Sequence, residues 1–345
     1  MSARRGPSAP RGFSARRGPS ARRGFSARPS SPARSGSVAR PLGIALGVAL
    51  DAVLADPRTA AHPVALFGRA AARLEQALYG DARRNGVAHV VLCVGAVTTL
   101  GVAAERTSDP TVRTALTALA TWAVLGGTTL AREGAYLATA LENGDLARAR
   151  ERLPHLCGRD PSHLEPPEIA RATVESLAEN TSDAVVAPLL WGAVAGIPGL
   201  LAYRAINTLD AMIGHRSPRY KRFGWAAARL DDVANYLPAR VTGLITVLVG
   251  PDPAQALAVL RDDGHRHPSP NAGRCEAAFA GALGLTLGGT NVYGGRTEHR
   301  PTMGHGRKPG IGDIRRAARL TRTVSLTAAG LAVLTAWTLR RRRQA

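Results

Sequence analysis

Several long apolar segments limit what this chain can fold into. The clearest occupy residues 86–104, 115–131, 184–202, 241–249 and 324–339. Three of them reach about 17 to 20 residues, the length that an α-helix needs to cross the hydrocarbon core of a bilayer. We therefore expect an all-α, polytopic integral membrane protein with polar, motif-bearing cytoplasmic loops.

Small residues dominate these segments. Ala, Gly and Thr stand where a soluble core would favour Leu, Ile and Phe, and such residues suit close helix packing in a bilayer. A buried helical bundle in a soluble protein stays open as an alternative, because several segments are short or carry His89 or Arg113. Pro188 and Pro198 predict a broken or re-entrant element in 184–202, so the number of crossings also stays open.

The charge of the chain is unevenly distributed. A formal net charge of +20 suggests nucleic acid or an anionic membrane surface as partner, but residues 1–40 contain ten arginines and no acid. We expect a disordered Arg-rich tail over 1–40, a single membrane domain over 41–339, a basic tail over 340–345, and no nucleic-acid partner. Since Met212 is the first methionine after Met1, a true start at Val38 is a second interpretation of the tail.

Four polar segments between the apolar ones carry more acids, amides and arginines than loops need. The first contains Asp51, Asp56 and His62, with Pro57 and Pro63 directly after the latter two. Because a residue before proline is biased to extended backbone, Asp56 and His62 are expected on a shaped turn. A turn with a helix-capping residue explains this pattern equally well.

The second segment runs from Pro166 to Asp183. Glu175, Glu179 and Asp183 recur every four residues and so share one helical face. Three aligned carboxylates repel one another unless a cation lies between them, which predicts a site for Mg²⁺ or an ammonium group. A solvated helix face is the alternative.

The third segment extends from Asn207 to Arg240. Asp231 and Asn235 lie one helical turn apart, and Asp232 adds a second carboxylate of the kind that a phosphate-bridging Mg²⁺ needs. Neighbouring cations can hold phosphate oxygens; they are Arg216, Arg219, Lys221 and Arg222. Anchoring of a cytoplasmic loop explains these cations but not the acids.

The fourth segment contains His265, His267 and a Pro-rich turn that presents Asn271 before the helix that carries Glu276. The two histidines have no third ligand at metal spacing, so we interpret them as surface residues. The three cysteines lie too far apart in the sequence for a zinc or disulfide framework. The sequence contains no P-loop, dinucleotide-binding or nucleophile-elbow motif.

Together these segments resemble the CobD/CbiB family of cobalamin biosynthesis proteins, over roughly residues 41–335. The stretches that carry the resemblance are 51–68, 179–183, 207–214, 220–240 and 269–273. The resemblance implies a multi-pass protein of the bacterial cytoplasmic membrane that joins adenosylcobyric acid to (R)-1-amino-2-propanol or its O-phosphate. The family reaction is an ATP-dependent amide synthesis with Mg²⁺. The implied partners are these corrinoid and amine substrates, membrane lipid and other cobalamin-assembly enzymes.

The chemistry of that reaction suggests roles for the polar residues. ATP must convert a carboxylate into an acyl phosphate, Mg²⁺ stabilises the phosphate charge, and the amine must lose a proton before it attacks. We expect Asp231 and Asp232 to hold Mg²⁺, and Glu179 or Asp183 to bind and deprotonate the amine, with Asp210 as a further catalytic candidate. The expected phosphate-binding residues are Arg216, Arg219 and Lys221. Further substrate contacts, including the amide groups of the corrin rim, are expected from Asn180, Asn207, Tyr220, Asn235, Arg240 and Asn271.

Two other functions fit parts of the pattern. A membrane alcohol-phosphate transferase also combines paired aspartates with arginine, but it requires further spaced aspartates. An AmpE-like membrane sensor or accessory protein needs neither the Glu179–Asp183 nor the Asp231–Asn235 carboxylate and amide sets.

Overall fold

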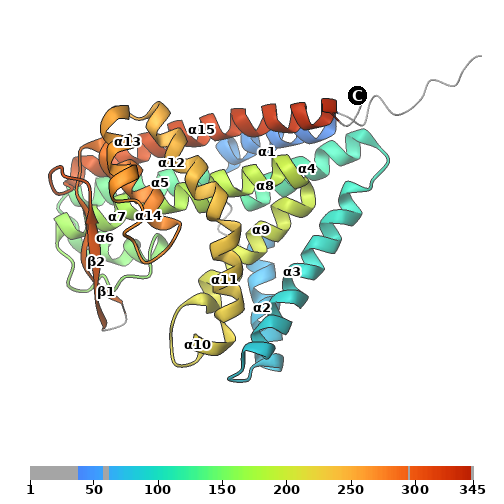
Figure 1. Ribbon diagram of the computed structural model, residues 1–345, viewed down its shortest axis with the longest axis horizontal. Helices are drawn as coiled ribbons and strands as arrows, with labels where there is room; N and C mark the ends of the chain where they lie inside the picture. Colours follow the sequence, from blue (N-terminus) through green and yellow to red (C-terminus); the bar gives the residue numbers. More distant parts are fainter. Residues whose placement is uncertain (1–37, 57–61, 294–295, 343–345) are drawn as a thin grey trace, which may run out of the picture.

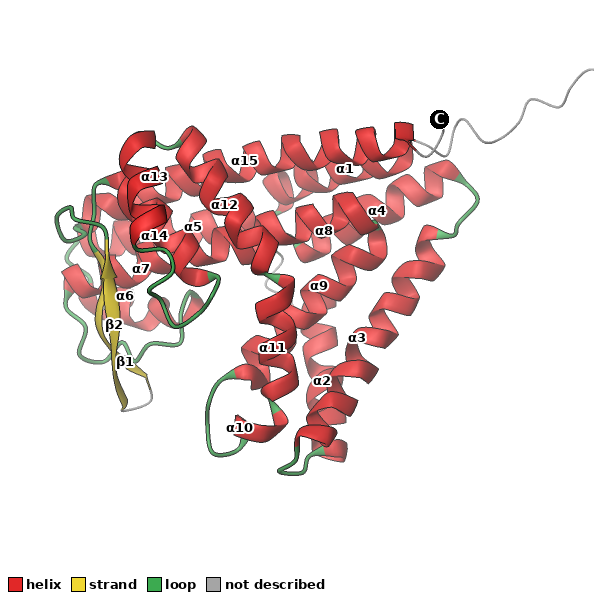
Figure 2. Cartoon of the chain, viewed as in Figure 1, coloured by secondary structure: helices red, strands yellow, loops and turns green. Residues whose placement is uncertain are grey.

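The computed structural model describes residues 38–56, 62–293 and 296–342, and helices make up most of it (Figure 1; Figure 2). The predicted disordered tail therefore lies, up to residue 37, outside the described residues. The helical elements are, in chain order, α1 (Ala39–Leu54), α2 (Pro63–Leu78), α3 (Arg83–Glu105), α4 (Pro110–Val124), α5 (Gly127–Glu142), α6 (Leu146–Arg152), η2 (Leu153–His155), α7 (Pro166–Thr181), η3 (Ser182–Val186), α8 (Ala187–Ala195), α9 (Ile197–Leu209), η4 (Asp210–Gly214), α10 (Tyr220–Phe223), α11 (Trp225–Ala234), α12 (Tyr236–Val249), α13 (Pro253–Asp262), α14 (Ala272–Leu283) and α15 (Ile311–Arg342).

One β-hairpin interrupts the helical fold. Strands β1 (Leu287–Tyr293) and β2 (Arg296–Met303) pair antiparallel, with a register shift between Leu287 and Gly289. Gly288 and Gly289 have φ angles of 89° and 93°, which L side chains rarely adopt, so glycine is needed at this bulge. The expectation of an all-α fold is therefore wrong for this segment, where Thr, Val and Tyr favour a strand.

The helices form two groups that meet at an angle (Figure 1). Helices α1, α4, α8 and α15 run alongside one another, and α5 and α7 pack beneath α15. Helices α2, α3, α9 and α11 form the second group, in which α3 packs against α9. The larger apolar core belongs to the first group, and a smaller core around Phe223 holds the second group together.

Small residues allow α1 and α4 to approach closely. A Cβ atom added at Gly43 would lie 2.4 Å from the Cβ of Thr117, and one added at Gly47 would lie 2.4 Å from the Cβ of Thr121. The two glycines are four residues apart and so face α4 on successive turns. Thr117 and Thr121 belong to the apolar segment 115–131, so small residues of that segment take part in helix–helix packing, whereas packing within a bilayer stays a prediction.

The apolar segment 184–202 is broken, as its prolines predict. Helix α8 ends at Ala195, Gly196 adopts a φ of 71°, and α9 begins at Ile197. The Glu105 carboxylate accepts a hydrogen bond of 2.9 Å from the backbone N–H of Ile197 and one of 2.9 Å from Arg40. This carboxylate therefore satisfies a backbone N–H at the buried start of α9 and ties it to α1 and α3.

Two helical stretches are long and apolar enough to cross a membrane. The stretch Arg83–Glu105 has a mean hydropathy of 2.1 and buries 22% of its most apolar window, as expected of a helix that faces lipid. The stretch Pro110–Glu142, which contains α4 and α5, has a mean hydropathy of 1.3 and buries 56% of its window, as a core helix does. The multi-pass topology stays a prediction.

Gly86 and Gly95 of α3 offer a matched pair of substitutions. A Cβ atom at Gly86 would lie 1.7 Å from the backbone oxygen of Phe223, whereas Gly95 has no atom within 4 Å of that position. We expect Gly86→Ala to destabilise the fold by about 1–3 kcal/mol, because the backbone of α10 must move. Gly95→Ala should leave stability unchanged or raise it by up to about 1 kcal/mol. Thermal unfolding of the two variants measures the difference, and equal melting temperatures would contradict this packing.

Candidate functional site

Three of the four polar segments meet at one small cavity. The cavity has a volume of about 30 Å³, room for about one water molecule or ion, and lies where η3, α11, α12 and α14 come together. We call it the acidic cavity. Its lining residues are Glu179, Ser182, Asp183, Asp231, Asn235, Ala239, Ser269, Asn271, Ala272 and Cys275.

Amide and hydroxyl groups fix the position of Asp231. The Asn235 side-chain amide donates a 3.0 Å hydrogen bond to Asp231 Oδ2, which confirms that these two residues lie side by side on successive turns. The Tyr203 hydroxyl donates to Asn235 Oδ1 at 2.7 Å, and Asn271 Nδ2 donates to the backbone oxygen of Asp232 at 2.8 Å. The side chain of Asn207 also hydrogen-bonds Asp231. The third and fourth polar segments are thus joined at the cavity wall.

The carboxylates of the cavity hold protons unusually well. Burial, and then the charge of Asp210, raise the pKa of Asp231 to about 7. Burial and the nearby Asp231 and Glu179 raise the pKa of Asp183 well above its ordinary value. Burial, Asp232 and Glu179 raise the pKa of Asp210 to about 6. Closely spaced carboxylates in a dry site favour either protons or a bound cation.

The donor set of the cavity fits a hard cation. Asp231 Oδ1, Asn271 Oδ1 and Ser182 Oγ are buried and accept or donate no hydrogen bond within the described part of the chain. In the same ranges no three His, Cys, Asp or Glu side chains form a ready metal cluster. Mg²⁺ takes only one or two protein carboxylates, so the oxygens of Asp183 and Asp231 are sufficient for it.

Asp232 points elsewhere. Its carboxylate lies 3.5 Å from Arg229 on the same helix and does not line the acidic cavity. Its role as a metal ligand stays a prediction. Asp183, from the second polar segment, lines the acidic cavity, so it is a candidate metal ligand.

The first polar segment approaches the same region. His62 Nε2 lies 3.9 Å from Asp56 Oδ1, and Asp56 Oδ2 would lie 3.4 Å from a Cβ atom at Gly126, which is itself next to Ala184. Arg204 of α9 is close enough for its charge to act on Asp56 and on Asp183. Sequence reasoning missed Arg204, although an arginine close to the broken apolar segment 184–202 was a usable signal.

Two of the predicted motifs contain π-helical turns. The turn η3 covers Ser182–Val186 and η4 covers Asp210–Gly214. Such turns insert an extra residue into a helix and often occur at functional sites. Asp183 and Asp210 thus owe their directions to backbone geometry that helical periodicity does not predict.

The predicted phosphate-binding cations lie away from the acidic cavity. Helix α10 lies at the opposite end of α11 from α12 (Figure 1). Arg219 donates to Glu75 Oε1 at 2.9 Å and Tyr220 donates to the same oxygen at 3.0 Å, so both tie α10 to α2. Arg216 and Lys221 are exposed there. Their contact with phosphate stays a prediction.

Two further candidates bind their own helices. Asn180 Nδ2 donates to the Ser176 backbone oxygen at 2.9 Å, and Arg240 Nη1 donates to the Tyr236 backbone oxygen at 2.6 Å. The Arg240 guanidinium also lies over the Tyr236 ring. Neither residue lines the acidic cavity, so a substrate contact by either stays a prediction.

Glu175 has a structural contact network of its own. It shares a helix with Glu179 and Asp183, but it forms a buried ion pair with Arg159 and accepts a 2.7 Å hydrogen bond from the backbone N–H of Gly288. Arg171 lies 3.5 Å from Glu175 Oε1, the oxygen that accepts the hydrogen bond from Gly288. Arg159 could not be predicted from the sequence, because nothing in the spacing links it to α7.

The interpretation of His267 as a surface residue is wrong. The side chain is buried, its Nδ1 accepts a 3.0 Å hydrogen bond from the backbone N–H of Ser269, and its Nε2 lies 3.8 Å from Glu276 Oε1. Burial and the charge of Arg300 lower the pKa of His267 to about 4. Burial and the charge of Glu175 raise the pKa of Glu276. His267 is therefore neutral near pH 7.

This burial predicts a loss of stability in acid. The folded state excludes the proton from His267 while the unfolded state accepts one near pH 6.5, so stability falls as the pH drops from about 6.5 to about 4. The full effect is roughly 3 kcal/mol. We expect His267→Asn, whose Oδ1 can still accept from Ser269, to lose less stability over that range than the wild type. Chemical denaturation at both pH values tests this, and parallel pH profiles would contradict it.

The structure is a mostly helical protein with one small acidic cavity, and the comparisons with known proteins identify its family. The family model "CobD/Cbib protein" matches residues 44–321. The chain therefore belongs to the CobD/CbiB family and has a role in cobalamin biosynthesis. The resemblance on which the sequence prediction relied is confirmed.

Relatives in several bacteria support this assignment. The chain is 55% identical over 297 residues to a cobalamin biosynthesis protein CobD of Mycobacterium tuberculosis H37Rv, covering 85% of this chain and 95% of that protein. It is 43% identical over 276 residues to one of Geobacter metallireducens, covering 77% and 87% of the two chains. One of Rhodobacter capsulatus is 43% identical over 268 residues, covering 76% and 85%. No solved structure matches the chain.

Proposed function

We propose that this protein catalyses the ATP-dependent formation of the amide bond between adenosylcobyric acid and (R)-1-amino-2-propanol or its O-phosphate. The observation that carries the proposal is the convergence of buried carboxylates and amides from separate segments on one cavity. Asp183 and Asp231 influence each other there, and Asn235 and Asn271 line the same wall. Membership of a cobalamin biosynthesis family supports the choice of substrates.

Two chemical steps make up the reaction. The substrate carboxylate attacks the γ-phosphorus of ATP to give an acyl phosphate and ADP, and the amine nitrogen then attacks the acyl carbon and releases inorganic phosphate. The amine must lose a proton, and Glu179 would accept it, since a carboxylate with a raised pKa is a suitable base near neutral pH. Bound Mg²⁺, held by Asp183 and Asp231, would neutralise phosphate charge.

Buried amides suit the recognition of a corrin rim. The Asn235 and Asn271 amides donate within the protein, and Asn271 Oδ1 is an acceptor that has no hydrogen bond to the described residues. An unpaired buried amide oxygen costs about 1–3 kcal/mol, which an amide N–H of the substrate would offset. These positions are therefore the substrate contacts that we favour among the predicted ones.

Complementation tests the proposal. A strain that cannot convert cobyric acid to cobinamide should grow when it carries the gene for this protein, without added cobinamide. Growth that still requires cobinamide, with the protein demonstrably present in the membrane fraction, would reject the proposed reaction. A membrane sensor or accessory protein of the AmpE-like kind would give that second result.

A further inference from the structure

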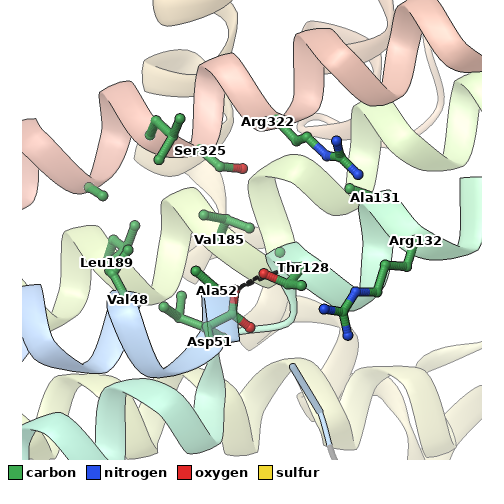
Figure 3. Close-up of a pocket in the computed structure, with 14 residues that line it drawn as sticks. Val48, Asp51, Ala52, Thr128, Ala131, Arg132, Val185, Leu189, Arg322 and Ser325 are labelled. Atoms are coloured by element: carbon green, nitrogen blue, oxygen red, sulfur yellow. Dashed lines mark hydrogen bonds between the residues drawn. The ribbon is translucent and has the colours of Figure 1, made fainter. Parts of the chain in front are cut away.

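A second cavity, of about 340 Å³, lies between α1, α5, α8 and α15 and shares no lining residue with the acidic cavity (Figure 3). Val185 of η3 lines the second cavity, whereas Ser182 and Asp183 of the same turn line the acidic one. Most of its wall is apolar. Its polar lining residues are Asp51, Thr128, Arg132, Arg322 and Ser325.

Asp51 provides a negative group inside this cavity. Its side chain is only 7% exposed, and its Oδ2 accepts hydrogen bonds from the Thr128 backbone N–H at 3.1 Å and from the Thr128 hydroxyl at 2.8 Å. Its Oδ1 is buried and has no hydrogen bond within the described ranges, and the same holds for the Ser325 hydroxyl. A buried carboxylate oxygen without a partner is costly, and an ammonium group would satisfy it.

Two arginines provide the opposite charge. Arg132 of α5 and Arg322 of α15 extend along the same side of the cavity (Figure 3). Both are exposed, and neither forms a hydrogen bond or an ion pair with another residue that the structure describes. Arg132 and Asp51 line the same cavity, and the charge of Arg132 acts on Asp51. The basic and acidic groups are therefore close enough to bind one small molecule. Paired guanidinium groups are well suited to a phosphate.

The space between these charges is open and apolar. Val48, Leu125 and Leu189 line it. A Cβ atom at Gly127 would lie 3.6 Å from Asp51 Oδ2 and 3.9 Å from Ser325 Oγ. Glycine at this position therefore leaves these two polar atoms accessible from the cavity. A short carbon chain fits such a gap.

We propose that the second cavity binds a small zwitterion in which a two- or three-carbon chain joins an ammonium group to a phosphate. Asp51 and Ser325 receive the ammonium group, and Arg132 and Arg322 hold the phosphate. The ligand is either a free amino-alcohol phosphate or the head group of a zwitterionic phospholipid. Binding at this site does not require amide synthesis. The idea that the free ligand is the amine substrate of the protein rests on the proposed function.

Calorimetric titration with O-phosphoethanolamine tests the site, using the full chain in phosphatidylglycerol nanodiscs without ATP or corrinoid. We expect binding that is at least about 10-fold weaker in Arg132→Met, Arg322→Met and Asp51→Asn. Arg319→Met, on α15 but outside the cavity lining, should bind like the wild type. Ethanolamine alone and inorganic phosphate alone should bind at least about 10-fold more weakly than the zwitterion.

A second arm separates the two sources of the ligand. If nanodiscs that contain phosphatidylethanolamine reduce the affinity for O-phosphoethanolamine, the lipid head group competes for the cavity. An unchanged affinity assigns the site to the free molecule. No binding to the wild type, or equal binding by the wild type and both arginine variants, would overturn the proposal. Since neither result depends on catalysis, complementation tests the proposed function separately.

Discussion

Replacing Asp231 with asparagine should lower amide formation by about 100- to 1000-fold and leave the protein folded. The carboxylate lines the acidic cavity and has one oxygen without a hydrogen bond in the described structure. Asparagine has nearly the same size and can still accept the 3.0 Å hydrogen bond from Asn235. It also removes a negative charge that acts on Asp183, so folding should not suffer.

Asp232→Asn is the matched control for this experiment. Its side chain lies beside Arg229 and outside the cavity lining, so we expect a loss of less than about 5-fold, within the range of an exposed ion pair. Product formation from adenosylcobyric acid should be measured at rising Mg²⁺ concentration for both variants. A larger loss and a raised Mg²⁺ requirement in Asp232→Asn would assign the metal to Asp232 and contradict the assignment to Asp231.

Arg159→Leu should destabilise the protein by about 3–5 kcal/mol, because it leaves the buried Glu175 carboxylate with only Arg171, 3.5 Å away, as an ionic partner. Arg159 is 6% exposed and Glu175 is 2% exposed. The Glu175 carboxylate also holds the backbone of Gly288 at the start of the hairpin. Loss of the guanidinium should therefore loosen the contact between α7 and β1 as well as weaken the ion pair. Thermal unfolding of the purified variant measures the loss.

The double variant Arg159→Leu/Glu175→Leu distinguishes an uncompensated charge from lost packing. If the buried charge causes the loss, the double variant should be more stable than Arg159→Leu alone, because no carboxylate is then left unpaired. A double variant that is less stable than either single variant would show that packing dominates. Arg315→Leu, which breaks the exposed pair with Glu142, is the surface control and should cost less than about 1 kcal/mol.

The sequence predicts the helices of this fold better than their ends. The apolar segment 115–131 reads as one span, but α4 ends at Val124 and α5 begins at Gly127, because Leu125 and Gly126 leave helical geometry between them. The break in 184–202 was predictable from Pro198. The hairpin was not expected, since its short strands lie in a polar, glycine-rich stretch that resembles a loop.

The acidic cavity was predictable where it depends on local spacing. Asp231 and Asn235 are four residues apart, so the helix alone brings them together. Contacts between segments that are distant in the sequence leave no comparable spacing pattern. Arg219 binds Glu75, which lies 144 residues away in the sequence, and this contact fixes Arg219 between α10 and α2. The exposed cations beside Arg219 produced a sequence pattern that resembles a phosphate site. Arg159 was missed for the same reason.

The π-helical turn η3 determines how the side chains of α8 are rotated about the helix axis relative to those of α7. Each residue of an α-helix advances the direction of its side chain by about 100°. A chain shortened by one residue within Ser182–Val186 could continue as a regular helix, but α8 would then present a different face relative to α7. Asp183 and Val185 would no longer point into separate cavities. The length of this turn, as much as its residues, therefore keeps the acidic cavity and the second cavity separate.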